Sequence, residues 1–258
     1  MFKTLSLIAF SMISATSMAS GPSLDEAQFC QDRQLAKYVK SLTNDSRNLM
    51  AFRNHGGLAN GGVCWWHSRF QRNALYLAIF KPNLPKPTED EARDLIKQIR
   101  FAKNVVIVPG YSNFREFTYD FESLVQRELE KWQKGDGFIR MAWTKGLAGK
   151  SEVAPEKLKE NMDAIYEEVE GKNNIAYNKL QIPGIDAHAW LVIGMKKRDN
   201  GYDLKVLDSN FPNQVDTFYY REGDTYLNYH GYFKLVPYLE RTNEMENVND
   251  VVNRFCNK

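Results

Sequence analysis

The chain has 258 residues, of which 43% are hydrophobic, 34 are Lys or Arg and 32 are Asp or Glu. This near-neutral balance offers no basic stripe of the kind that nucleic-acid-binding domains carry, so we expect no nucleic-acid partner. Because no internal repeat or low-complexity tract marks a linker, the length fits one domain with a sizeable core.

The first 19 residues have the layout of a secretory signal peptide. Lys3 precedes an apolar run over 5–13, and Ser17 and Ala19 occupy the two positions that a signal peptidase reads. No later stretch has the roughly 20 apolar residues that a spanning helix needs. We therefore expect cleavage near Ala19, a secreted or periplasmic protein without a membrane span, and a single domain over 20–258.

The first part of the mature chain is predicted to be helical and then irregular. Helical periodicity covers about 24–44, and a glycine-rich stretch over 55–63 favours an irregular backbone. A strongly apolar helical pattern follows directly and stops at Pro82. The spacing therefore places Cys64 in the first turn of a buried helix, behind a glycine-rich loop.

The middle of the chain, over about 85–170, reads mostly as amphipathic helix and is expected to form an inserted helical lobe. Such a lobe is expected to act as a lid or as one wall of a cleft. The predicted helices cover 89–102, 114–132 and 154–170, with a short apolar run at 105–108.

The second half changes to the alternating pattern of strands, separated by turn sequences such as Asp199-Asn200-Gly201. A last polar helix is expected over about 243–254. Helices first and a largely antiparallel sheet second make an α+β fold class. The predicted strands are 187–195, 202–207, 214–220 and 232–236.

The three cysteines predict one disulfide and one free thiol, because an oxidising compartment leaves an odd cysteine unpaired. Cys30 lies near the start of the mature chain and Cys256 near its end. A bridge between them closes a very long loop, worth roughly 5 kcal/mol in the chain-entropy model. We expect this pair, with Cys64 left free; the alternative is that Cys30 and Cys256 are reduced or pair differently.

Cys64 has the placement of a nucleophile. A thiol attacks as its thiolate, which the positive end of a helix favours. The glycines before it allow the loop backbone to approach a substrate carbonyl, so that backbone N–H groups can stabilise an oxyanion.

His188 is the expected base, because it is a polar residue at the head of an otherwise apolar strand. The next strand ends at Asp208. Across a hairpin turning at 199–201, that end returns beside the start of the His188 strand, so that the Asp208 carboxylate can accept the second imidazole N–H.

In this order the residues resemble the papain-like superfamily in its broad sense, which includes thiol peptidases, transglutaminase-like enzymes and bacteriocin-processing peptidases. There the cysteine opens a central helix and is commonly followed by Trp, as in Cys64-Trp65, while His and then Asp or Asn lie on adjacent antiparallel strands. The resemblance covers 61–80 and 185–212, about a fifth of the chain. It implies a papain-like α+β fold with Cys64, His188 and Asp208 as the triad.

The sequence departs from papain in its oxyanion donor. Papain has a glutamine six residues before its cysteine, where this chain has Leu58. Asn60 offers an amide nearer to Cys64 and is the expected substitute. Asn210 is an alternative to Asp208 as the partner of the histidine; we favour Asp208, which ends the strand and resembles the ending of the processing-peptidase branch, and expect Asn210 to cap the turn.

Other candidate groups near these residues are weaker. His67 lies on the same helix as Cys64, where it is poorly placed to reach past the thiol toward a leaving group. Asp186 is expected to face solvent or to shape the cleft. Zinc needs three or four convergent ligands, and His55, His67 and Cys64 lack such spacing, so we expect no metal and no cofactor.

The sequence thus predicts an exported cysteine peptidase or amidase, a hydrolase that acts on a peptide or protein substrate through a thioester. Two alternatives stay open. One is a transglutaminase-like acyltransferase, in which an amine resolves the acyl-enzyme. The other is an inactive papain-like binding module. The sequence indicates neither the specificity nor the oligomeric state.

Overall fold

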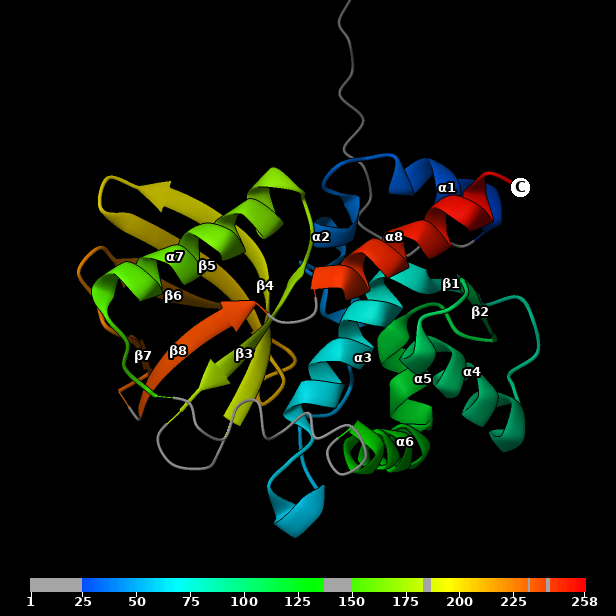
Figure 1. The fold of residues 1–258 in the computed structure, drawn as a ribbon. Helices are drawn as coiled ribbons and strands as arrows, with labels where there is room; N and C mark the ends of the chain where they lie inside the picture. Colours follow the sequence, from blue (N-terminus) through cyan, green and yellow to red (C-terminus); the bar gives the residue numbers. More distant parts are fainter. Residues whose placement is uncertain (1–24, 137–149, 183–186, 232, 240–241) are drawn as a thin grey trace, which may run out of the picture.

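The computed structural model describes residues 25–136, 150–182, 187–231, 233–239 and 242–258. The expected signal peptide and its cleavage point lie outside these residues. Helices make up most of the first half of the described chain and strands most of the second, which confirms the predicted α+β class (Figure 1).

The helices follow local signals in the sequence. A capping box between Thr88 and Glu91 opens α4, and Pro155 occupies the first turn of α7. The α-helices are α1 (Glu26–Arg33), α2 (Tyr38–Leu42), α3 (Cys64–Leu77), α4 (Glu89–Phe101), α5 (Phe114–Asp120), α6 (Glu122–Lys134), α7 (Pro155–Tyr166) and α8 (Thr242–Cys256). Shorter helical turns are η1 (Ser46–Asn48), η2 (Leu58–Asn60) and the π-turn η4 (Glu167–Gly171).

The strands form a small parallel pair and one larger antiparallel sheet. The pair is β1–β2, and the sheet has the order β6-β5-β4-β3-β8-β7. The two-residue turn at 199–200 joins β4 and β5, as the sequence predicts. The strands are β1 (Ala78–Lys81), β2 (Val106–Pro109), β3 (Ala176–Gln181), β4 (Ala187–Arg198), β5 (Gly201–Asp208), β6 (Asp216–Arg221), β7 (Leu227–Tyr229) and β8 (Phe233–Leu239).

The larger sheet separates two hydrophobic cores. One core lies between β4 and the helical half, with Leu191 and Ile193 packed near α3. The other core contains Trp190 and Val192 and is covered by α7. This alternation along β4 follows from the period of two in a strand.

Helix α3 packs against α4, α6 and α8 as well as against β3 and β4 (Figure 1). Every residue of α3 is buried. The helix that begins with Cys64 is therefore in contact with both the helical half and the sheet.

Several predicted boundaries are wrong. The helix expected to run to Pro82 ends at Leu77, because 78–81 pairs in parallel with 106–109. The helices expected over 24–44 and 114–132 are each two helices. Strands β3 and β7 lie where no strand is expected.

The helical stretch over about 85–170 contributes to both halves. Helices α4 and α6 pack against α3, whereas α7 packs against β8 and covers the sheet. Its described helices are thus parts of the two cores.

Cys30 and Cys256 form a disulfide, as predicted, with their Cα atoms 5.4 Å apart. The bridge joins α1 to α8, which lie side by side (Figure 1). Phe29 and Phe255 pack edge to face beside it, with ring centroids 5.7 Å apart. Cys64 is a free cysteine.

Candidate active site

Cys64 is the first residue of α3 and is 7% exposed. The Val63 carbonyl accepts hydrogen bonds from the N–H groups of Trp66 and His67, at 3.0 and 2.8 Å, and so starts the helix. The partial positive charge at a helix N-terminus favours an anion there.

The glycine-rich loop before Cys64 folds back on itself. The N–H of Gly62 donates to the Gly56 carbonyl at 2.7 Å. Gly62 has a φ of 83°, in the left-handed region that glycine adopts without strain. A Cβ at this position would also lie 2.5 Å from Asn54 Nδ2. Two independent reasons thus require glycine two residues before the cysteine.

One face of α6 braces this loop. Gln126, Glu130 and Gln133 are spaced four and three residues apart, so their side chains share a face of the helix. Each contacts the loop backbone. The hydrogen bonds are Gln126 Nε2 to the His55 carbonyl (3.0 Å), Gly57 N–H to Glu130 Oε1 (3.2 Å), Leu58 N–H to Gln133 Oε1 (2.9 Å) and Gln133 Nε2 to the Gly62 carbonyl (3.0 Å).

His188 and Asp208 come from neighbouring strands and are in contact. Asp208 ends β5 and pairs with Trp190, two residues after His188 on β4. His188 Nε2 lies 2.7 Å from Asp208 Oδ1. A further hydrogen bond joins the imidazole to Cys64. Because Asp208 contacts Nε2, the nitrogen that remains for Cys64 is Nδ1. The structure thus brings Cys64, His188 and Asp208 together.

The electrostatics of the pair favour two charged groups. Burial opposes an imidazolium, but the charges and hydrogen bonds of Asp208 and Cys64 outweigh it and raise the pKa of His188 to about 10. Burial also opposes ionisation of Asp208, yet the charge and hydrogen bond of His188 hold the pKa of this carboxyl below its usual range.

Two further groups hold the Asp208 carboxylate, and sequence reasoning missed one of them. The Tyr229 hydroxyl donates to Asp208 Oδ2 at 2.8 Å, and the Asn210 N–H donates to Oδ1 at 2.8 Å. Tyr229 belongs to β7, and its ring stands edge-on to His188 with centroids 6.4 Å apart. A lone tyrosine 21 residues after the acid carries no sequence signal.

The side chains of Asn210 and Asn60 have other surroundings than those of the three candidate residues. The Asn210 side chain contacts Asn54, so Asp208 rather than Asn210 is the residue in contact with His188. Asn60 ends η2 with an exposed side chain and a φ of 59°. Asp186 lies outside the described residues.

His67 is buried and neutral. Burial lowers its pKa to about 4, against the hydrogen bond that its Nε2 makes with the Phe52 carbonyl at 3.0 Å. A neutral imidazole must donate its proton to that carbonyl. His67 therefore anchors the segment at Phe52.

Trp65 and Trp190 have different surroundings. The Lys179 ammonium lies over the ring of Trp65, 3.7 Å from its centroid, at the start of α3. Trp190 is fully buried against Phe218 in the core beneath α7, with ring centroids 4.5 Å apart. Trp65 is thus the tryptophan directly beside Cys64.

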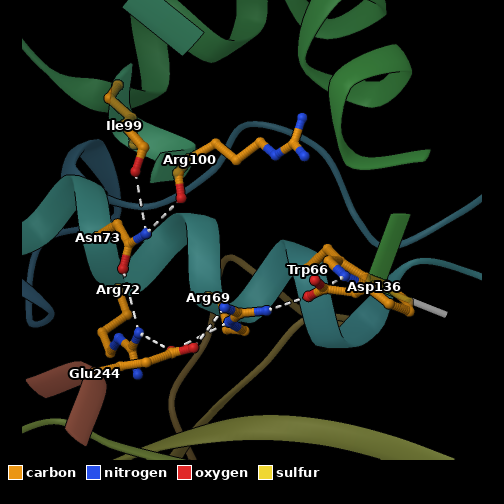
Figure 2. Close-up of polar contacts among 8 residues, drawn as sticks. All are labelled: Trp66, Arg69, Arg72, Asn73, Ile99, Arg100, Asp136 and Glu244. Atoms are coloured by element: carbon orange, nitrogen blue, oxygen red, sulfur yellow. Dashed lines mark hydrogen bonds and ion pairs between the residues drawn. The ribbon is translucent and has the colours of Figure 1, made fainter. Parts of the chain in front are cut away.

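A buried charge network holds α3 further along its length. Arg69 lies between Asp136 and Glu244, at 2.8 and 2.5 Å, and Arg72 contacts Glu244 at 2.8 Å (Figure 2). Trp66 Nε1 donates to the same Asp136 carboxylate at 3.3 Å. Because each buried charge has a partner, the network orients α3 between the end of α6 and α8.

Among the described residues no three His, Cys, Asp or Glu side chains converge as metal ligands. Nor does any described helix have the length and apolar character needed to cross a membrane.

Comparisons with protein-family models, with curated proteins and with solved structures found no match.

Proposed function

We propose that the protein is an exported thiol hydrolase, a peptidase or amidase of papain-like architecture, with Cys64 as nucleophile, His188 as base and acid, and Asp208 as the group that orients His188. The observation that carries the proposal is the hydrogen-bonded series from a cysteine at a helix start, through a histidine, to a buried carboxylate. This is the arrangement that nucleophilic catalysis at a carbonyl requires.

The proposed reaction has two stages. The Cys64 thiolate attacks the carbonyl carbon, and the tetrahedral intermediate collapses as the His188 imidazolium gives its proton to the leaving amine. Water then attacks the thioester while His188 takes a proton from it, and the acid product leaves. Cys64 and His188 return to the thiolate–imidazolium pair, so that no other reactant is needed.

Backbone groups are the proposed oxyanion donors. The helix N-terminus at Cys64 directs N–H groups and positive potential toward an anion. Asn60 has an exposed side chain in left-handed backbone and is kept as a secondary candidate. An Asn60→Ala variant should therefore retain most of the activity.

The architecture supports the same assignment. The cysteine helix precedes an antiparallel sheet, and adjacent strands carry the histidine and the acid. Export is supported by the disulfide between Cys30 and Cys256, because such bonds persist in oxidising compartments.

The first test is alkylation of Cys64 by iodoacetamide as a function of pH. In the disulfide-bonded protein Cys64 is the free thiol. At about pH 6 an ordinary thiol is almost entirely protonated, whereas the proposed ion pair stays reactive. We expect a rate at about pH 6 close to that at about pH 8, and a fall of about 100-fold at pH 6 in His188→Ala.

The accessibility of Cys64 to iodoacetamide changes the alkylation rate of a given variant by the same factor at every pH. The variants are therefore compared by the shape of their pH profiles. A wild-type profile that rises steadily toward high pH and matches His188→Ala would reject the triad. If the flat profile is found, the products formed from a peptide are compared with and without an added primary amine, and Cys64→Ala is the control. A hydrolase releases the acid, whereas an acyltransferase joins the acyl group to the amine. A flat profile without turnover of any peptide or amide would instead indicate a binding module.

A further inference from the structure

Three residues, which we call the linking chain (Asn54, Asn210 and Tyr229), lie between the Val63 N–H and the Asp208 carboxylate and are hydrogen-bonded to one or both of them. Asn54 Oδ1 accepts from the Val63 N–H at 2.5 Å, and Asn54 Nδ2 donates to Asn210 Oδ1 at 3.0 Å. The Asn210 backbone N–H donates to Asp208 Oδ1 at 2.8 Å, and the Tyr229 hydroxyl donates to Asp208 Oδ2 at 2.8 Å.

The direction of two of these hydrogen bonds follows from the groups that they join. Because the Asn54 carbonyl oxygen is taken by the Val63 N–H, its NH₂ group is the donor to Asn210 Oδ1. Burial and Asp208 raise the pKa of the Tyr229 hydroxyl, and the ionised carboxylate of Asp208 can only accept a hydrogen bond. The phenolic proton is therefore directed at Asp208.

The linking chain closes a loop through the candidate site. Val63 is covalently joined to Cys64, which contacts His188, and His188 contacts Asp208. We propose that the linking chain positions the start of α3 against the His188–Asp208 pair and that its members act as one unit. The inference rests on the proposed function, because it assigns these residues a role in the reactivity of the thiol.

Asn54 contacts both the residue before Cys64 and the segment that follows β5. Its own N–H donates to the Ser209 carbonyl at 2.7 Å, directly after β5. On the other side it contacts Val63, and only a glycine at position 62 leaves room for its amide. Asn54 and Asn210 are 156 residues apart in sequence, so no local element holds these two segments together.

Small displacements of reacting groups have large kinetic effects, of about 100-fold for a shift of about 1 Å. Loss of Tyr229 also removes one of the donors that keep Asp208 ionised. Both effects weaken the ion pair that makes the thiol reactive at low pH.

The test uses the full disulfide-bonded chain and the iodoacetamide pH profile. We expect Asn54→Leu and Tyr229→Phe each to lower the rate at about pH 6 by about tenfold and to recover much of it at about pH 9. The double variant is expected to lose little more than either single variant, since both residues act on one hydrogen-bonded network around the Asp208 carboxylate.

Asn73→Leu is the matched control. Asn73 is a buried asparagine of α3 whose amide donates to the carbonyls of Ile99 and Arg100, away from the thiol. We expect this variant to lower the midpoint of urea unfolding while keeping the wild-type pH profile. A residue with a purely structural role would behave as Asn73 does.

The outcomes separate the two proposals. If wild type and His188→Ala share one profile, the proposed function fails. If wild type has the flat profile and folded Asn54→Leu and Tyr229→Phe keep it, or if their losses multiply in the double variant, the linking chain fails while the triad stands. Should Asn54→Leu not fold, Tyr229→Phe, which removes a single oxygen, decides between the profiles.

Discussion

Asp208 shows how a buried carboxylate is kept charged in this fold. Its oxygens accept hydrogen bonds from His188, Tyr229 and the Asn210 N–H. A buried charge is tolerated where it is paired and hydrogen-bonded, and these donors meet that condition. The carboxylate can then hold the imidazolium in place.

Asp208→Asn should destabilise the protein, because it leaves the buried His188 imidazolium without its charged partner. Removing one partner of a buried ion pair typically costs about 3–5 kcal/mol of unfolding free energy. The folded pKa of His188, about 10, is above its unfolded value of 6.5, so the pair contributes fully below about pH 6.5, and that contribution disappears as the pH rises through about 10. Urea unfolding over this range should show a decline in wild type that Asp208→Asn lacks. Parallel slopes in the two proteins would contradict the assignment.

The buried, neutral His67 predicts that the unfolding free energy falls as the pH is lowered. Its folded pKa of about 4 lies below the unfolded value of 6.5, so the unfolded chain binds the proton first as the pH falls. The unfolding free energy should decrease between about pH 6.5 and pH 4, by up to about 3 kcal/mol. His67→Gln keeps a donor for the Phe52 carbonyl and should remove that part of the acid slope. An unchanged slope in the variant would show that His67 is not the titrating group.

At the scale of elements, α6 determines the path of the loop before Cys64. Four hydrogen bonds from one helix face fix a segment that has little regular structure of its own. A glycine-rich loop loses much conformational entropy on ordering, so external contacts of this kind are needed.

Gln133→Leu should release this loop. The variant leaves the Leu58 N–H and the Gly62 carbonyl without their partner, at a cost of about 2–4 kcal/mol. Hydrogen exchange should increase over 56–63 beyond what the lower global stability explains.

Gln71→Leu is the matched control, because the buried Gln71 side chain also bonds two backbone groups, the Met50 N–H and the Asn48 carbonyl. This control should lose comparable stability without selective exchange over 56–63. Equal protection of that loop in both variants would show that α6 does not brace it.

At the scale of the whole molecule, the two cores meet along β4, and a disulfide joins α1 to α8. The disulfide closes a separation of 226 residues and joins α1 to α8, while Glu244 of α8 contacts Arg69 and Arg72 of α3. The last helix thus connects the terminal bridge to the helix that begins with Cys64 (Figure 1).

A Cys30→Ser/Cys256→Ser protein should be less stable than wild type by about 2–5 kcal/mol in urea unfolding. The loss arises mainly because the unfolded chain regains freedom, so α3 and the sheet should keep their hydrogen-exchange protection relative to global unfolding. Wild type treated with a reductant should match the variant. Identical midpoints for oxidised and reduced wild type would show that the bridge does not stabilise the fold.

Local patterns in the sequence determined a large part of this structure. The glycine-rich stretch followed by an apolar run predicts a helix that starts at Cys64, and the structure begins α3 at that residue. The contact between His188 and Asp208 follows from a two-residue turn, because a short hairpin fixes the register of its strands. The pairing of Cys30 with Cys256 is expected because these two cysteines lie near the two ends of the mature chain, so that a bridge between them closes the longest loop.

Only the tertiary structure decided how these parts are held. Tyr229, Asn54 and the binding face of α6 contact segments far away in sequence, and long-range hydrogen bonds leave no periodic pattern along the chain. Strand β3 lies between β4 and β8, and β1 replaces the last turn of a predicted helix by pairing with β2. In each case the partner that satisfies a backbone or buried polar group is remote, so its identity depends on the packed fold.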